Sequence, residues 1–164
     1  MPGAIHDLLA TDHARLDGLL ARGDADPARI DLDAYEELRA GLLRHIAMEE
    51  KVLLPHARRL RGGEPLAIAK QLKLDHAALA SLLIPSPTHA LIVAVREVLA
   101  EHNPLEEGPH GMYAACEALL GSDAERIIDE LGALPPIRVS AHLDEPRVHE
   151  HIARALAARR PRVG

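Results

Sequence analysis

Apolar residues recur three and four positions apart along most of the chain, in runs separated by proline and glycine. That spacing places them on one face of an α-helix. It predicts four long helices at about 4–22, 31–61, 64–84 and 88–107, and shorter ones near 112–120, 124–131 and 146–158. The short connections between the long helices favour antiparallel neighbours. We therefore expect an all-α protein, an up-down-up-down four-helix bundle with short additional C-terminal helices.

Composition supports this fold class and adds one anomaly. The 164 residues include two Tyr but no Phe and no Trp, which disfavours a β-sandwich or β-barrel. The length suits one domain, and we expect residues 1–110 to form the bundle core and residues 111–164 a helical extension packed on or flanking it. Eleven histidines are more than a generic helical bundle needs.

Charge and targeting features exclude several classes of partner. A net charge of −6 argues against nucleic acid. No run approaches about 20 apolar residues, so no membrane span is expected. The N-terminus lacks the features of a secretion signal, and the single Cys116 suits a reducing compartment, so we expect a cytoplasmic protein. The basic end at 159–162 is interpreted as a frayed, solvated tail.

An internal repeat organises the histidines. Residues 12–20 (DHARLDGLL) and 75–83 (DHAALASLL) agree at six of nine positions. Residues 42–50 (LLRHIAMEE) and 99–107 (LAEHNPLEE) share Leu, His and both Glu in register. The chain therefore reads as two helix hairpins, each with a histidine on its first helix and His-x-x-x-Glu on its second.

Six side chains of this repeat lie in phase with the apolar stripes of their helices: His13, His45, Glu49, His76, His102 and Glu106. A buried carboxylate without a partner is costly or becomes protonated. Cations satisfy two carboxylates and four imidazoles better, and these donors suit Fe, Zn or Mn. The pattern predicts a site for two metal ions between the four helices.

Other polar residues are given lesser roles. Glu50 and Glu107 are expected in an outer shell or in solvent. His56 shares the face of His45 and, like His6, is expected to be structural, although His56 could also join the outer shell. Tyr113 could reach the site as a hydrogen-bond donor or redox-active phenol. The remaining histidines are taken as surface residues: His89, His110, His142, His149 and His151.

These motifs resemble the hemerythrin-like (HHE cation-binding) family. The matching pieces are the Asp-His pairs at 12–13 and 75–76, the stretch 45–55 (HIAMEEKVLLP) and the stretch 102–107 (HNPLEE). The resemblance covers about residues 5–110. It implies a four-helix bundle with two Fe ions joined by an oxo or hydroxo bridge. It assigns His13 and His45 to one iron, His76 and His102 to the other, and Glu49 and Glu106 to both.

The chain departs from that family in two places. Oxygen carriers have two histidines four apart on the third helix, whereas Leu72 and Ala80 flank His76 here. Both irons then have an open position, which Glu50, Tyr113, His56 or water could fill. The dipeptide at 108–109 is Gly-Pro, so Glu106 is expected near a helix end. A ferritin-like site would need Glu-x-x-His on two helices and is rejected.

The main hypothesis is a di-iron protein that binds or senses O₂ or a related small oxidant. The alternatives are a di-iron oxidoreductase acting on peroxide or NO, iron storage or delivery, or a structural metal site with Zn or Mn. An unidentified redox or signalling partner is left open.

Overall fold

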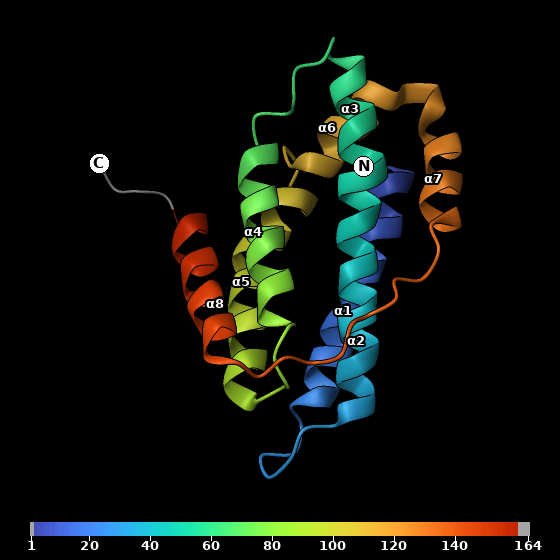
Figure 1. The fold of residues 1–164 in the computed structure, drawn as a ribbon. Coiled ribbons are helices and arrows are strands. Elements are labelled where there is room, and N and C mark those ends of the chain that lie inside the picture. Colours follow the sequence, from blue (N-terminus) through green and yellow to red (C-terminus); the bar gives the residue numbers. More distant parts are fainter. Residues whose placement is uncertain (1, 161–164) are drawn as a thin grey trace.

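The computed structural model describes residues 2–160, and they form a helical bundle (Figure 1). Among these residues there is no β-strand. The elements are α1 (Ala4–Gly23), α2 (Leu32–Met48), the π-helical η1 (Glu49–Leu53), α3 (Leu54–Leu60), α4 (Ala69–Leu82), α5 (His89–Glu107), α6 (Met112–Leu120), the 3₁₀ turn η2 (Gly121–Asp123), α7 (Ala124–Ala133) and α8 (Pro146–Arg159).

Local signals explain where the long helices begin and end. Asp31 and Thr88 cap α2 and α5, because their side-chain oxygens accept hydrogen bonds from the backbone N–H of the third residue beyond. Gly62 and Gly63 follow α3 with φ of 70° and 99°, values that favour glycine. The third long helix was expected from about residue 64 and begins at Ala69, because turns occupy the segment after the glycines.

The segment expected as one helix over 31–61 is continuous but changes its winding. Glu49–Leu53 form a π-helical turn, in which Leu54 N–H donates to the carbonyl of Glu49 five residues earlier. Pro55 follows directly and has no N–H to continue the α-helical ladder. The extra residue rotates everything beyond Glu49 relative to the face of His45.

The long helices pack pairwise, α1 with α2 and α4 with α5 (Figure 1). The C-terminal helices cover this frame: α6 contacts α1, α3 and α5, α7 contacts α1 and η1, and α8 contacts α4. Within residues 2–160, no helix combines the length and apolarity needed to cross a bilayer.

Two apolar clusters fill the interior, and the polar residues of the repeat lie between them. One cluster contains Ile5, Leu9, Met48, Leu53, Leu72 and Cys116. The other contains Leu16, Leu20, Tyr35, Leu42, Leu79 and Val95. His13 lies on α1 between Leu9 of the first cluster and Leu16 of the second, so the site is walled by hydrocarbon at both ends.

Candidate metal centre

The structure brings the six predicted side chains together in two buried groups. The first group consists of His13, His45, Glu49 and Glu106, and the second of Glu49, His76, His102 and Glu106. In each group one nitrogen or oxygen atom per residue lies within 4.8 Å of the others. The two glutamates belong to both groups. None of the six is more than 6% exposed.

The Nε2 atoms of the histidines face the shared carboxylates. In the first group, His13 Nε2 lies 3.3 Å from Glu106 Oε2, and His45 Nε2 lies 3.2 Å from Glu49 Oε1. In the second, His76 Nε2 lies 3.1 Å from Glu49 Oε2. His102 Nε2 lies 2.9 Å from Glu106 Oε1. Each glutamate therefore turns one oxygen to each group.

The Nδ1 atom of every one of these histidines meets a second carboxylate. Asp12 lies 2.8 Å from His45 Nδ1, and Asp75 lies 3.1 Å from His102 Nδ1. Glu50 lies 3.0 Å from His76 Nδ1, and Glu107 accepts from His13 Nδ1. A carboxylate can only accept, so Nδ1 carries a proton and Nε2 points to the centre. This outer carboxylate is typical of metal-bound histidine.

The outer contacts connect the two sequence repeats. Each aspartate supports a histidine within its own hairpin, from α1 to α2 and from α4 to α5. Each outer glutamate supports a histidine of the other hairpin: Glu50 reaches His76, and Glu107 reaches His13. The outer-shell role expected for Glu50 and Glu107 fits these contacts. No role of their own was expected for Asp12 and Asp75 from the sequence, although an aspartate precedes the first histidine of both repeats.

Helix irregularities position the shared glutamates. Glu49 is the first residue of the π turn, a kind of insertion common at functional sites. Glu106 lies in the last turn of α5 and is fully buried despite the Gly-Pro break that follows. Gly111 directly precedes α6, and a Cβ there would lie 2.5 Å from the carbonyl oxygen of Glu106. Only glycine therefore allows α6 to start this close to the end of α5.

Tyr113 on α6 lies against the first group. This position is one of the alternatives expected for Tyr113 from the sequence. Its hydroxyl donates to Glu49 Oε1 at 2.7 Å and lies 3.1 Å from Glu106 Oε2. It also lies 3.3 Å from His13 Nε2 and 3.4 Å from His45 Nε2. Burial and the charges of the two glutamates raise the pKa of Tyr113 well above its usual value, so without a cation it is a neutral phenol.

The same electrostatics act on the histidines and glutamates. Burial lowers the pKa of His45, but the charge of Glu49 and the hydrogen bonds outweigh it and raise the pKa to about 10. Burial lowers the pKa of His76 as well, but the nearby carboxylates of Glu106 and Glu49 outweigh burial and raise the pKa to about 11. The pKa of Glu49 is lowered in turn, against burial and the charge of Glu106, by its histidine neighbours. Without a metal ion, protons on the imidazoles would balance the carboxylates.

Three atoms test whether the donors fit a metal ion. Glu49 Oε2, His76 Nε2 and Glu106 Oε1 are buried and have no hydrogen-bond partner. His76 Nε2 nevertheless lies 3.1 Å from Glu49 Oε2 and 3.4 Å from Glu106 Oε1. Such atoms are costly to bury unless something else satisfies them. A metal ion binds nitrogen and oxygen lone pairs of this kind, so these residues fit a metal ion.

The C-terminal end corrects one expectation. Arg159 is 7% exposed rather than solvated, and its Nε donates to Asp75 Oδ1 at 2.9 Å. Gln71 donates to the same oxygen at 2.9 Å. Arg159 therefore reaches the carboxylate that supports His102. Arg160 is exposed, and positions 161 and 162 of the expected tail lie outside the described residues.

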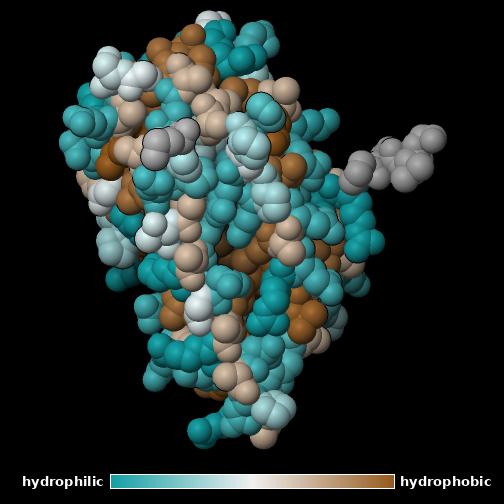
Figure 2. Space-filling view, turned by 180° about the vertical axis from the view of Figure 1, so that it is seen from behind, coloured by the Kyte–Doolittle hydropathy of each residue, from teal (hydrophilic) through white to brown (hydrophobic). Residues whose placement is uncertain are grey.

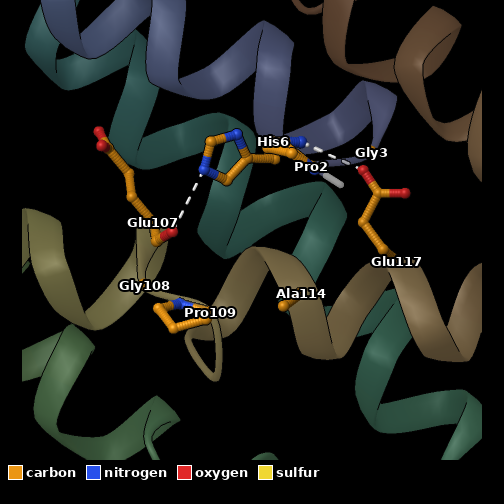
Figure 3. Close-up of a pocket in the computed structure, with 8 residues that line it drawn as sticks. All are labelled: Pro2, Gly3, His6, Glu107, Gly108, Pro109, Ala114 and Glu117. Atoms are coloured by element: carbon orange, nitrogen blue, oxygen red, sulfur yellow. Dashed lines mark hydrogen bonds between the residues drawn. The ribbon is translucent and has the colours of Figure 1, made fainter.

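The remaining histidines lie outside both groups. His6 donates from Nε2 to the carbonyl of Glu107 at 3.2 Å (Figure 3), and its ring lies edge-on to Tyr113. His56 bonds to Glu130 at 2.8 Å, because the π turn rotates it away from His45. His89 and His142 were taken as surface residues without partners, but they are half-buried and bond to Asp24 and Glu36.

A mostly apolar groove of about 260 Å³ between α1 and α5 reaches His13 of the first group, with Asp17 and Arg96 also in its lining. His13 lines it together with Leu16, Leu20, Leu99, Ala100 and Asn103. Figure 2 shows a hollow with apolar side chains on the face turned away in Figure 1, among mostly hydrophilic atoms. A small apolar molecule could approach His13 along this groove.

Comparison with known proteins agrees with this geometry. The chain matches the family described as the hemerythrin HHE cation binding domain over residues 4–109. No curated protein and no solved structure shows significant similarity to it. The match spans more than half of the chain and contains all six residues of the two groups, whereas Tyr113 and Arg159 lie beyond it. The protein belongs to the hemerythrin HHE cation-binding domain family.

Proposed function

We propose that this protein is a non-haem di-iron protein that binds or senses O₂ or a related small oxidant. The observation that carries the proposal is the sharing of Glu49 and Glu106 between two buried groups. Paired metal ions in proteins lie about 3.5–4 Å apart, and bridging carboxylates suit that spacing. His13 and His45 would hold one ion, and His76 and His102 the other.

The donor set suits iron. Imidazole and carboxylate suit Fe, with Mn or Zn as substitutes, and no thiolate takes part. Cys116 lies in an apolar cluster, where burial raises the pKa of its thiol to about 12. The pairwise packing of α1 with α2 and of α4 with α5 supports the up-down-up-down arrangement that the proposal includes.

When bound, the two irons would supply redox chemistry and open positions for O₂ or peroxide. The chain's own residues would prepare that chemistry. The two apolar clusters exclude water, and the outer carboxylates fix the orientation of each imidazole. The groove beside His13 gives an apolar entry path. Tyr113 holds a proton at its hydroxyl, 2.7 Å from Glu49 Oε1.

The first experiment measures the metal content of anaerobically purified protein and then its absorption spectrum on adding O₂. We expect about two irons per chain and new near-ultraviolet bands. His102→Ala should reduce the iron content, whereas His89→Ala, outside both groups, should not. Full iron loading in His102→Ala, or zinc in place of iron in the natural protein, would overturn the proposal.

A di-iron oxidoreductase is the second candidate. The residues that flank His76 favour it, because Leu72 and Ala80 supply no further ligand. A metal ion held there would keep an open position for a reacting ligand. Turnover of peroxide by the iron-loaded protein with an added reductant would support the enzyme, and reversible O₂ binding without turnover would support the binder. Cytoplasmic location and a redox or signalling partner stay predictions.

A further inference from the structure

Tyr113 occupies a position that its hydrogen bonds alone do not explain. Its hydroxyl faces two carboxylate oxygens and two imidazole nitrogens within 3.4 Å. A phenol has one proton and can donate to one of these carboxylates. The other, 3.1 Å away on Glu106, then faces a phenol lone pair. A cation among the five atoms would remove this conflict, because all five would present lone pairs to it.

The distances fit a common coordination sphere. Ligands at right angles around an ion with bonds of about 2.1 Å lie about 3 Å apart. The hydroxyl of Tyr113 lies 2.7–3.4 Å from the four atoms of the first group. Two neighbouring pairs among those four atoms are 3.2 and 3.3 Å apart. The hydroxyl thus has the spacing of a fifth ligand beside the other four.

The placement of Tyr113 is fixed by its surroundings. Its side chain is fully buried. Gly111 allows α6 to start against the end of α5. Further along α6, Glu117 accepts a hydrogen bond from the backbone N–H of Ile5 at 2.6 Å and so joins α6 to the start of α1.

We propose that Tyr113 binds, as a phenolate, the metal ion held by His13, His45, Glu49 and Glu106. The ion on the side of His76 and His102 has no counterpart, since the only other tyrosine, Tyr35, packs in an apolar cluster. The exogenous ligand is therefore directed to that second ion. This inference rests on the proposed function and adds an asymmetry to the centre.

The test exploits an aromatic content of two Tyr and no Trp, because a phenolate dominates the near-ultraviolet difference spectrum. Chelator-treated protein is titrated with Zn²⁺, which is itself colourless. We expect one phenolate per chain at saturation. Tyr113→Phe should abolish this signal, and the matched control Tyr35→Phe should retain it.

The outcomes separate the two proposals. Stoichiometric binding of Zn²⁺ without a phenolate signal overturns the role of Tyr113 and leaves the metal centre standing. Failure to bind either Zn²⁺ or iron overturns both. If Tyr113→Phe does not fold, resonance Raman spectroscopy of the natural ferric protein decides, since phenolate bound to iron gives its own vibrations and their absence contradicts the proposal.

Azide tests which ion takes the exogenous ligand. The natural ferric protein should bind one azide per pair of irons. Tyr113→Phe frees a position on the other ion and should bind a second azide, which doubles the stoichiometry. One azide in both proteins would overturn the assignment of the ligand to the side of His76 and His102.

Discussion

Arg159 donates from its guanidinium to the carboxylate of Asp75 at 2.9 Å and so joins α8 to the support of His102. Both side chains are buried. The corresponding aspartate of the first repeat, Asp12, pairs instead with Arg15, which is 46% exposed. The two halves of the centre thus have the same inner donors but differ in how their outer carboxylates are compensated.

Arg159→Met should weaken metal binding on the side of His102. Removing the guanidinium leaves Asp75 buried with less compensation, and loss of an outer-shell contact commonly costs about 10- to 100-fold in metal affinity. Metal titration should then become biphasic. Arg15→Met is the matched control and should change affinity much less, because an exposed ion pair contributes little. Equal effects of both substitutions would contradict the asymmetry.

Glu50→Ala should act on the hairpin to which Glu50 does not belong. Glu50 supports His76 at 3.0 Å, so its removal frees that imidazole to turn. We expect weaker binding of the ion at His76, with a double-mutant cycle between Glu50 and His76 giving a coupling energy. The same cycle between Glu50 and His45 should give little coupling. Strong coupling of Glu50 to His45 and little coupling to His76 would contradict support across the two hairpins.

Chelator-treated protein should lose stability as the pH rises above about 6.5. In the folded protein the pKa of His45 is about 10 and that of His76 about 11, against an ordinary value of 6.5. Protonation of these imidazoles therefore stabilises the folded state fully below pH 6.5, and this stabilisation is lost as the pH rises toward the folded-state values. Urea unfolding at about pH 6 and about pH 9 measures this. Metal-loaded protein should show the opposite trend over the acidic part of the range, because protons compete with the ions.

Gly111→Ala should displace α6 and with it Tyr113. The new Cβ would meet the backbone carbonyl of Glu106 at 2.5 Å, and such overpacking costs about 1–3 kcal/mol in the free energy of unfolding. The phenolate signal of the zinc-loaded protein should fall as well. Gly18→Ala has open space and should be neutral or stabilising. An unchanged signal in Gly111→Ala would show that α6 tolerates the shift.

Ala100→Trp should slow the reaction with O₂ without changing the iron content. Ala100 is an exposed residue that lines the groove beside His13, so a large ring there fills the entry path. Stopped-flow mixing of reduced protein with O₂ measures the rate. Val93→Trp, two turns away on α5 and also exposed, serves as the control. Equal rates in both variants would mean that O₂ enters elsewhere.

The sequence predicted the helices and the six central residues because both follow from local periodicity. Helix limits came from Pro and Gly, and the in-phase His and Glu came from the repeat. The π turn at Glu49 was missed because nothing local distinguishes it from an α-helix containing an allowed proline. Consequently the expected shared face of His45 and His56 was wrong.

The rest depended on how separate helices meet. Arg159 reaches Asp75 from 84 residues away, and an exposed basic tail was the simpler interpretation. Tyr113 could be weighed but not placed, since its position depends on the turn that Gly111 allows. The support of His13 by Glu107 depends on the register of the two hairpins against each other, which neither hairpin determines alone.

The exchanged glutamates bear on the history of the chain. A lone ancestral hairpin would have lacked the carboxylate that steadies its first histidine, because that group is carried by the opposite hairpin. Two separate copies would have to associate before either group of donors was complete. Within one polypeptide that dependence on concentration is absent, and the two groups of donors differ in this chain, with a phenol beside one and an arginine behind the other.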